Sequence, residues 1–285
     1  MEFKDIHTVA VIGAGTMGQG IVISCALSGY ETFLFDISPG VGERAFLFIR
    51  QSIEQSVTKG KLTREAGDEG LRRIKIIDRL SDLRADLIIE AIIEKLEVKQ
   101  KLFSDLEKIN SKDTILATNT SSLSITQIAS VLQNPSRFVG LHFFNPAHLM
   151  KLVEVISGTL TDPHIAMRTI EFSKSLGKIP VEVKDSPGFI VNRVARHFYV
   201  ESLKLLEEGV SDVEGIDKLL RSSGFKMGPF ELMDLIGIDV NYAVTTSVYE
   251  GFNCNPKFKP SEIQKKKIDQ GFLGRKTGKG FYEYK

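Results

Sequence analysis

The sequence contains very little cysteine: Cys25 and Cys254 are the only two in 285 residues. They stand far apart, without a CxxC pair or a histidine spacing that would suit zinc. We therefore expect no disulfide bond and no metal site, and a reducing compartment is favoured. No apolar run approaches the length of a membrane span, and the N-terminus has no cationic leader with a cleavage site. These absences predict a cytoplasmic protein that does not enter a membrane.

Excess charge is also lacking, because 37 basic residues face 36 acidic ones and the formal net charge is +1. Such a chain has no global field to gather nucleic acid or an anionic membrane surface, so neither is expected as a partner. An anionic ligand would have to be bound by a local group of residues. The composition, 42% hydrophobic and 26% charged, is ordinary for a soluble protein, and the length fits two domains.

Short β-rich runs alternate with helical patterns through the first part of the chain. The β-rich runs are VAVIGAG, ETFLFD, DLIIEAI, TILATN and RFVGLHFF. This alternation predicts a mainly parallel sheet, and the continuous apolar runs indicate strands that are buried on both faces. Pro187-Gly188 breaks the pattern, and helical periodicity follows in FIVNRVARHFYVESLKLLEEG and VEGIDKLLRSSG. We therefore expect an α/β domain in residues 1–185 and an all-α domain in residues 186–285.

The segment GAGTMG, residues 13–18, directly follows the VAVI run and begins a predicted helix. That context is the one a dinucleotide-binding fingerprint requires. Gly13 permits a tight turn, Gly15 lets the main chain approach a pyrophosphate, and Gly18 lets the helix close on the strand. With Thr16 and Met17 they form a helix N-terminus whose free amides would face the anion. The alternative is a glycine turn that only connects two elements.

Asp36 ends the next β-rich run, ETFLFD, where an acidic residue would bind the ribose hydroxyls of a dinucleotide. A carboxylate at this point repels a 2′-phosphate, so NAD is favoured over NADP. The glycine loop and Asp36 together predict a Rossmann-type first domain. Other polar residues also follow the predicted strands: Glu90, Glu94, Asn119, Ser121, His142 and Asn145. Because the carboxyl ends of parallel strands share one crevice, we expect them near the cofactor, with Asn119 and Ser121 as candidate contacts.

His142 and Glu154 lie in the stretch GLHFFNPAHLMKLVEVI, residues 140–156. Removing a hydride from an alcohol leaves a proton that needs an acceptor near neutral pH, and histidine suits that task. A partly buried Glu154 would need a partner, and as a carboxylate it would orient the His142 ring and stabilise the imidazolium. Two alternatives remain open. His142 could be a hydrogen-bonded core residue, and Glu154 could face solvent on an edge strand.

The chain resembles the L-3-hydroxyacyl-CoA dehydrogenase family, in particular the bacterial 3-hydroxybutyryl-CoA dehydrogenases. The segments that carry the resemblance are GAGTMG, EKLEVKQKLF, ATNTSSLSI, GLHFFNPAHLMKLVEVI, KDSPGFIVNR and GRKTGKGFYEY. They cover essentially the whole chain. Two departures are Lys95 in EKLEVK, where asparagine is commoner, and His148, where proline is frequent. Neither falls on a residue with an expected chemical role, but both bear on the shape of the pocket.

The resemblance implies reversible NAD-dependent oxidation of a short-chain (3S)-3-hydroxyacyl-CoA, in fatty acid or butanoate metabolism. His142 would be the general base, oriented by Glu154, while Ser121 and Asn192 would hold the substrate. Further residues carried over by position are Glu94, Lys99, Ser121 and Lys276 for NAD, and Ser52 and Lys59 for coenzyme A. Lys61, in the same KGK segment, could add to the coenzyme A site.

The resemblance also implies a homodimer formed through the helical domain, whose apolar faces would be too exposed in a monomer. Two alternative functions remain. One is a dehydrogenase of a sugar acid such as gulonate, and the other is a non-catalytic NAD-binding protein of the crystallin kind. An acyl-CoA cleft and the KGK segment argue against the first. His142, Glu154, Ser121 and Asn192 argue against the second.

Overall fold

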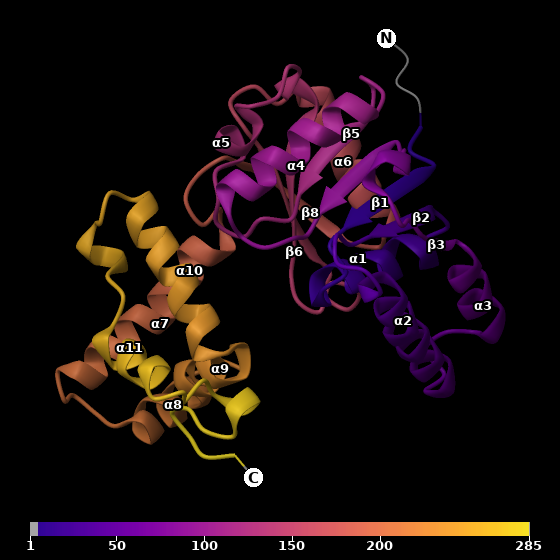
Figure 1. The fold of residues 1–285 in the computed structure, drawn as a ribbon. Coiled ribbons are helices and arrows are strands. Elements are labelled where there is room, and N and C mark those ends of the chain that lie inside the picture. The colour runs from indigo at the N-terminus through magenta and orange to yellow at the C-terminus, as the bar shows by residue number, and fades with distance from the viewer. Residues whose placement is uncertain (1–4, 285) are drawn as a thin grey trace. The chain divides into compact units, whose positions relative to one another are not determined.

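The computed structural model describes residues 5–284 and divides into two compact units, residues 1–185 and residues 186–285 (Figure 1). The first unit is built on one eight-stranded sheet in the order β3-β2-β1-β4-β5-β6-β7-β8. Its strands are β1 (Thr8–Ile12), β2 (Glu31–Phe35), β3 (Ile74–Ile76), β4 (Leu87–Glu90), β5 (Ile115–Thr118), β6 (Phe138–Phe143), β7 (Leu152–Ser157) and β8 (Ile179–Lys184). Its helices are α1 (Thr16–Leu27), α2 (Val41–Thr58), α3 (Arg64–Arg72), α4 (Leu96–Ile109), α5 (Ile125–Ala129) and α6 (Pro163–Ser175).

Six strands, β1 to β6, run parallel, and β7 pairs antiparallel with β6 before β8 continues parallel to β7. The central strands are buried on both faces, as their continuous apolar sequences predict. This arrangement confirms the predicted α/β class with a mainly parallel sheet. β3 and β8, which form the two edges of the sheet, were not predicted. Because β8 lies outside it, β7 is an internal strand.

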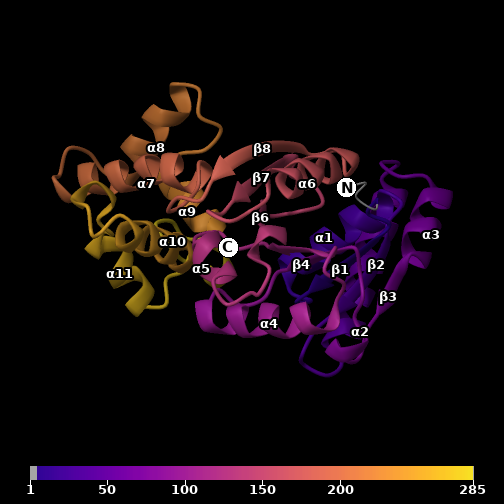
Figure 2. The ribbon, with the colours of Figure 1, turned by 90° about the horizontal axis from the view of Figure 1, so that it is seen from above.

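The two faces of the sheet carry different side chains, because successive residues of a strand point to opposite sides. One face is apolar: Val11, Ile89, Ala117 and Leu141 belong to a core shared with α1, α2 and α6. Figure 2 shows α1 and α6 on the side of the sheet opposite α4 and α5. The alternate residues of the same strands, among them His142, therefore point toward the α4 and α5 side. The buried Glu90, His142 and Glu154 side chains therefore share one face of the sheet.

The second unit is all-helical, in agreement with the prediction. Its helices are α7 (Val191–Glu207), α8 (Val213–Ser222), α9 (Pro229–Ile236), α10 (Ile238–Gly251) and α11 (Glu262–Asp269). Tyr199, Leu203 and Phe230 form the centre of its core. The buried Asp234 carboxylate accepts hydrogen bonds from the backbone amides of Phe281 and Tyr282, both at 2.9 Å, which fastens the C-terminal segment to α9. Across residues 5–284, no helix is both long and apolar enough to cross a membrane.

Candidate functional site

The glycine loop between β1 and α1 has the geometry of a phosphate-binding turn. Gly13 has φ +101°, and a Cβ on it would lie 2.5 Å from the Ala91 carbonyl oxygen. A Cβ on Gly18 would lie 1.8 Å from the Gly13 carbonyl oxygen, so the helix can approach the strand only because this residue is glycine. Around Gly15 nothing lies within 4 Å of that position, so a pyrophosphate has room to approach the main chain.

The N-terminus of α1 begins at Thr16, beside Met17, and no side chain caps it. Its first amides are therefore available to an anion, and the positive end of the helix dipole favours one there. Asp36 follows β2 and fixes the loop, since its Oδ2 accepts a hydrogen bond from the Ala14 amide at 2.9 Å and its Oδ1 accepts one from the Ser38 amide at 2.9 Å. These residues fit the pyrophosphate and ribose of a dinucleotide.

His142 and Glu154 face each other across the antiparallel pair of β6 and β7. The distance from His142 Nδ1 to Glu154 Oε2 is 2.8 Å, and the two residues are 6% and 1% exposed. The Phe144 ring packs 4.4 Å from the imidazole between centroids. A carboxylate this deeply buried is tolerable only with a hydrogen-bonded partner, and the ring supplies it. The pair can therefore take up a proton on the ring while the carboxylate balances the new charge.

Glu94 holds the loop that follows β5. Its Oε1 accepts hydrogen bonds from the hydroxyl groups of Thr120, Ser121 and Ser122 and from the amides of Ser121 and Ser122, at 2.6–3.4 Å. Burial would raise the pKa of Glu94, but Lys99 and the bonds from Thr120 and Ser121 outweigh it, and the pKa lies below its usual value. The carboxylate is therefore ionised near neutral pH and fixes the place of Ser121 in the first unit.

Lys99 and Asn119 lie at the carboxyl ends of the sheet strands, as Glu94 and His142 do. Lys99, on α4, is 1% exposed and contacts Glu90 and Glu94 at 2.5 and 3.2 Å. Asn119 follows β5, and its Oδ1 accepts a hydrogen bond from the Phe143 amide at 2.8 Å, next to His142. The structure thus brings Asn119, Glu94, Lys99 and His142 to the carboxyl ends of β4, β5 and β6.

The remaining predicted residues lie elsewhere. Ser52 lies within α2, whereas exposed Lys59 and Lys61 lie in the turn that follows the last residue of that helix. In the helical unit, Asn192 is in the first turn of α7. Lys276 Nζ lies 2.6 and 2.7 Å from the two carboxylate oxygens of Asp239. Their roles in binding NAD, substrate or coenzyme A stay predictions.

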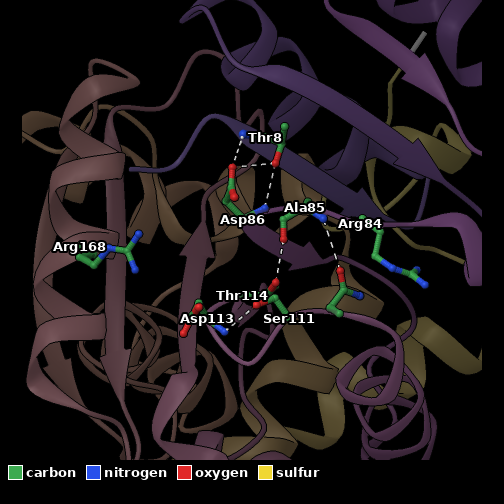
Figure 3. A pocket seen from close by; sticks show the side chains of 9 residues that line it. Thr8, Arg84, Ala85, Asp86, Ser111, Asp113, Thr114 and Arg168 are labelled. Carbon is green, nitrogen blue, oxygen red and sulfur yellow. Dashed lines mark hydrogen bonds between the residues drawn. The ribbon is translucent and has the colours of Figure 1, made fainter. Parts of the chain in front are cut away.

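A partly open cavity of about 390 Å³ lies at the amino ends of the sheet strands (Figure 3). Among its lining residues, Thr8 is the first residue of β1 and Thr114 directly precedes β5. Arg168 reaches the cavity from α6. Figure 3 shows the Asp86 carboxylate turned toward Thr8, whose amide and hydroxyl donate to Asp86 Oδ2 at 2.9 and 2.8 Å. Because it lies at the amino ends of the strands, this cavity is not the dinucleotide site.

Sequence reasoning overlooked several residues that build the site. Thr120 and Ser122 share the Glu94 carboxylate with Ser121, and Thr118 donates to buried Glu90 at 2.6 Å. The run TNTSS directly after a predicted strand is the signal that could have found them, because clustered hydroxyls there suggest a carboxylate to be satisfied. Within residues 5–284, no group of three or more His, Cys, Asp or Glu side chains is arranged to hold a metal.

The fold and the site define a dinucleotide-binding oxidoreductase, and comparison with known proteins gives its family. Residues 8–186 match the profile of the 3-hydroxyacyl-CoA dehydrogenase NAD binding domain, and residues 188–284 match that of the 3-hydroxyacyl-CoA dehydrogenase C-terminal domain. The chain belongs to the 3-hydroxyacyl-CoA dehydrogenase family, whose cofactor is NAD. The resemblance, the enzyme class and the cofactor inferred from the sequence are thereby confirmed.

Individual relatives differ in the acyl group that their names carry. The chain is 48% identical to 3-hydroxyadipyl-CoA dehydrogenase of Escherichia coli over 99% of its own length and 60% of that protein. It is 41% identical to 3-hydroxybutyryl-CoA dehydrogenase of Clostridioides difficile, over 97% of this chain and 99% of that one. The crystal structure of a 3-hydroxybutyryl-CoA dehydrogenase from Escherichia coli superposes with a TM-score of 0.96 at 48% identity, covering 99% of this chain and 60% of that chain.

Proposed function

We propose that the protein catalyses the reversible NAD-dependent oxidation of a short-chain (3S)-3-hydroxyacyl-CoA to the 3-ketoacyl-CoA, with 3-hydroxybutyryl-CoA as the first candidate. The observation that carries this proposal is the 2.8 Å hydrogen bond between buried His142 and Glu154 at the edge of the sheet where the glycine loop opens. Family membership supports the acyl-CoA substrate. Residues 1–185 would bind NAD, and residues 186–285 would bind substrate and form the dimer.

Bound NAD would supply the acceptor for the hydride that leaves C3 of the substrate. The loop of Gly13, Gly15 and Gly18 would bind its pyrophosphate, with Asp36 at the adenosine ribose. Because Glu154 accepts a hydrogen bond from His142 Nδ1–H, the neutral ring carries its lone pair on Nε2, and this atom takes the hydroxyl proton. The carboxylate then stabilises the imidazolium, and the same proton returns in the reductive direction.

Ser121 and Asn192 would position the 3-oxygen of the substrate, and Ser52, Lys59 and Lys61 would contact the nucleotide part of coenzyme A. Exposed lysines at the end of α2 suit phosphate groups, because an ammonium is a strong local positive charge in a chain with little net charge. Binding energy from coenzyme A, remote from the reacting carbon, would be available to hold C3 in place. Such a protein would act in the cytoplasm, where thiols stay reduced.

The test compares three rates: NADH oxidation with acetoacetyl-CoA, NADH oxidation with 3-oxoadipyl-CoA, and NAD reduction with gulonate. Acetoacetyl-CoA should be reduced fastest. A preference for 3-oxoadipyl-CoA would move the substrate assignment toward a dicarboxylic acyl group and leave the mechanism intact. Turnover of gulonate alone would replace the acyl-CoA assignment, while the absence of any turnover despite NADH binding would favour a non-catalytic protein.

We also propose a homodimer through an apolar groove on the helical unit. The groove, about 580 Å³, is lined by α7 residues Val194 and Phe198 together with Phe225 and Met227 from the segment between α8 and α9. Val194 is 66% exposed and Phe225 51%. Apolar side chains this exposed and this contiguous indicate a surface that another protein covers, and a second copy of the chain is the simplest occupant.

A further inference from the structure

A lysine between two glutamates forms a buried charge cluster beside the candidate site. Glu90, the last residue of β4, is fully buried, and Lys99, in the first turns of α4, is 1% exposed. Lys99 Nζ lies 2.5 Å from Glu90 Oε1 and 3.2 Å from Glu94 Oε2. A buried ammonium without a carboxylate would be strongly unfavourable, so the three side chains depend on one another.

Glu90 is the fixed member of this cluster. Its Oε2 accepts a hydrogen bond from the Thr118 hydroxyl at 2.6 Å, and its Oε1 accepts one from the Ile92 amide at 2.7 Å. Both carboxylate oxygens are therefore held by groups that are themselves part of the sheet or of the turn that leaves it. Lys99 is placed by Glu90, and Lys99 in turn places one oxygen of Glu94.

Glu94 in turn fixes the 120–122 loop, because its other oxygen, Oε1, accepts the hydrogen bonds from Thr120, Ser121 and Ser122 described above. In a Rossmann-type sheet, the dinucleotide crosses the carboxyl ends of the strands from β2 and β1 toward β4 and β5. Since Asp36 marks the adenosine side, the 120–122 loop lies on the side of the nicotinamide ribose.

We propose that Glu90 and Lys99 are positioning residues for NAD: Glu90 fixes Lys99, Lys99 fixes Glu94, and Glu94 holds the 120–122 loop in its cofactor-binding shape. The proposal rests on the proposed placement of the nicotinamide half. The competing explanation is a cluster that only stabilises the fold. A control for a purely structural role lies at the other end of α4. There Glu107 accepts hydrogen bonds from the Gln133 and Asn134 amides at 2.8 and 2.9 Å and pairs with Arg137 at 3.4 Å.

Removing the lysine should reveal the role through pH. The charged groups that face Glu94 within the described residues are Lys99, from α4, and behind it Glu90, from β4; the 120–122 loop contributes hydroxyls and amides. In the wild-type protein the pKa of Glu94 is lowered, so its ionised form is lost only as the pH falls through that low value, and NADH affinity should be constant between about pH 6 and pH 9. In Lys99→Met two carboxylates share the site without a cation, which favours protonation of one of them.

The experiment is a fluorescence titration of NADH across that pH range with wild type, Lys99→Met, Glu90→Gln/Lys99→Met and Glu107→Gln. Lys99→Met should bind NADH about 10-fold or more weakly near pH 6 and recover as the pH rises. The double variant should lose this pH dependence, because Glu94 no longer competes with a second carboxylate for the proton. Glu107→Gln should lower Tm and leave the NADH Kd unchanged.

Two results would overturn the proposal. One is a Lys99→Met protein with lowered Tm and a wild-type, pH-independent NADH Kd, which is the behaviour of a purely structural cluster. The other concerns Glu90→Gln, which keeps the shape of the side chain and serves as the test variant if Lys99→Met does not fold. A Glu90→Gln protein that binds NADH as tightly as wild type at every pH would overturn the proposal. A wild-type protein that binds NADH but does not reduce acetoacetyl-CoA would refute the proposed substrate and leave this inference standing.

Discussion

The decisive perturbation of the proposed mechanism is Glu154→Gln, which keeps the size of the side chain and a hydrogen-bond acceptor but removes the charge beside His142. The pair is almost fully buried, and its hydrogen bond is 2.8 Å long. Two unit charges about 4 Å apart interact by about 4 kcal/mol at an effective dielectric constant of about 20. The amide dipole retains part of this, so a loss of about 3 kcal/mol for the imidazolium is a reasonable expectation.

A loss of this size lowers kcat by about 10²-fold, within the range of about 10² to 10⁴ that disabled acid–base groups show. The assay is the steady-state rate of NADH oxidation with saturating acetoacetyl-CoA, for Glu154→Gln, His142→Gln and the double variant. If the carboxylate acts only through the imidazole, it has nothing left to do once His142 is replaced. The double variant should therefore be little slower than His142→Gln, and the two effects should be strongly non-additive.

NADH binding, measured by titration, is the control and should be the same in all three variants. Additive losses in the double variant would mean that Glu154 acts independently of the ring, for instance as a carboxylate that stabilises β7. A His142→Gln protein with near-wild-type kcat would refute the reasoning altogether. The histidine would then be a hydrogen-bonded core residue, the alternative that the sequence alone left open.

Three further predictions concern binding and assembly. Asp36→Ala should raise the KM for NADH and reduce the preference for NADH over NADPH, because it removes a ribose acceptor, a repulsive charge and the hydrogen bond from the Ala14 amide. A wild-type protein that prefers NADPH would contradict this prediction. Lys59→Ala should raise the KM for acetoacetyl-CoA and spare a substrate without the nucleotide, with exposed Lys112→Ala as the control; equal losses on both substrates would remove the assignment. Val194→Lys should yield a monomer by light scattering, whereas Leu160→Lys, at a similarly exposed apolar residue of the first unit, should not; an unchanged mass would exclude the groove.

The central strands could be predicted because burial on both faces leaves a simple signal, a continuous apolar run between turns. The edge strands give no such signal. β3 is only three residues long and includes exposed Lys75, and β8 contains Pro180 and exposed Glu182. An edge strand is half solvated and tolerates proline, so its sequence resembles a loop. What places β3 and β8 in the sheet is the neighbouring strand, which the local sequence does not report.

The same distinction, between features that a local sequence signal predicts and features that depend on distant segments, applies to the site. The glycine loop and Asp36 are local features of one strand–turn–helix unit, so their spacing predicts their geometry. The hydrogen bonds that Glu94 accepts from the 120–122 loop join two different strand–helix units, and the local sequence gives no sign of them. A lysine as buried as Lys99 is also contrary to its usual preference for solvent, so composition would place it at the surface. Such contacts follow from tertiary structure and not from local pattern.

The reversal of chain direction between β6 and β7 is the feature that makes the His142–Glu154 pair possible. Only residues 144–151 separate the two strands, which is too short for the crossover that a parallel neighbour needs, so β7 must return antiparallel. His142 is near the end of β6, whereas Glu154 is near the start of β7. In a parallel pair with the strand ends aligned, these positions would lie two residues, or about 7 Å, apart along the strands, at about 3.3 Å per residue. The antiparallel return instead sets them directly opposite each other on one face, and an otherwise parallel sheet acquires a buried histidine–carboxylate pair at its ligand-binding edge.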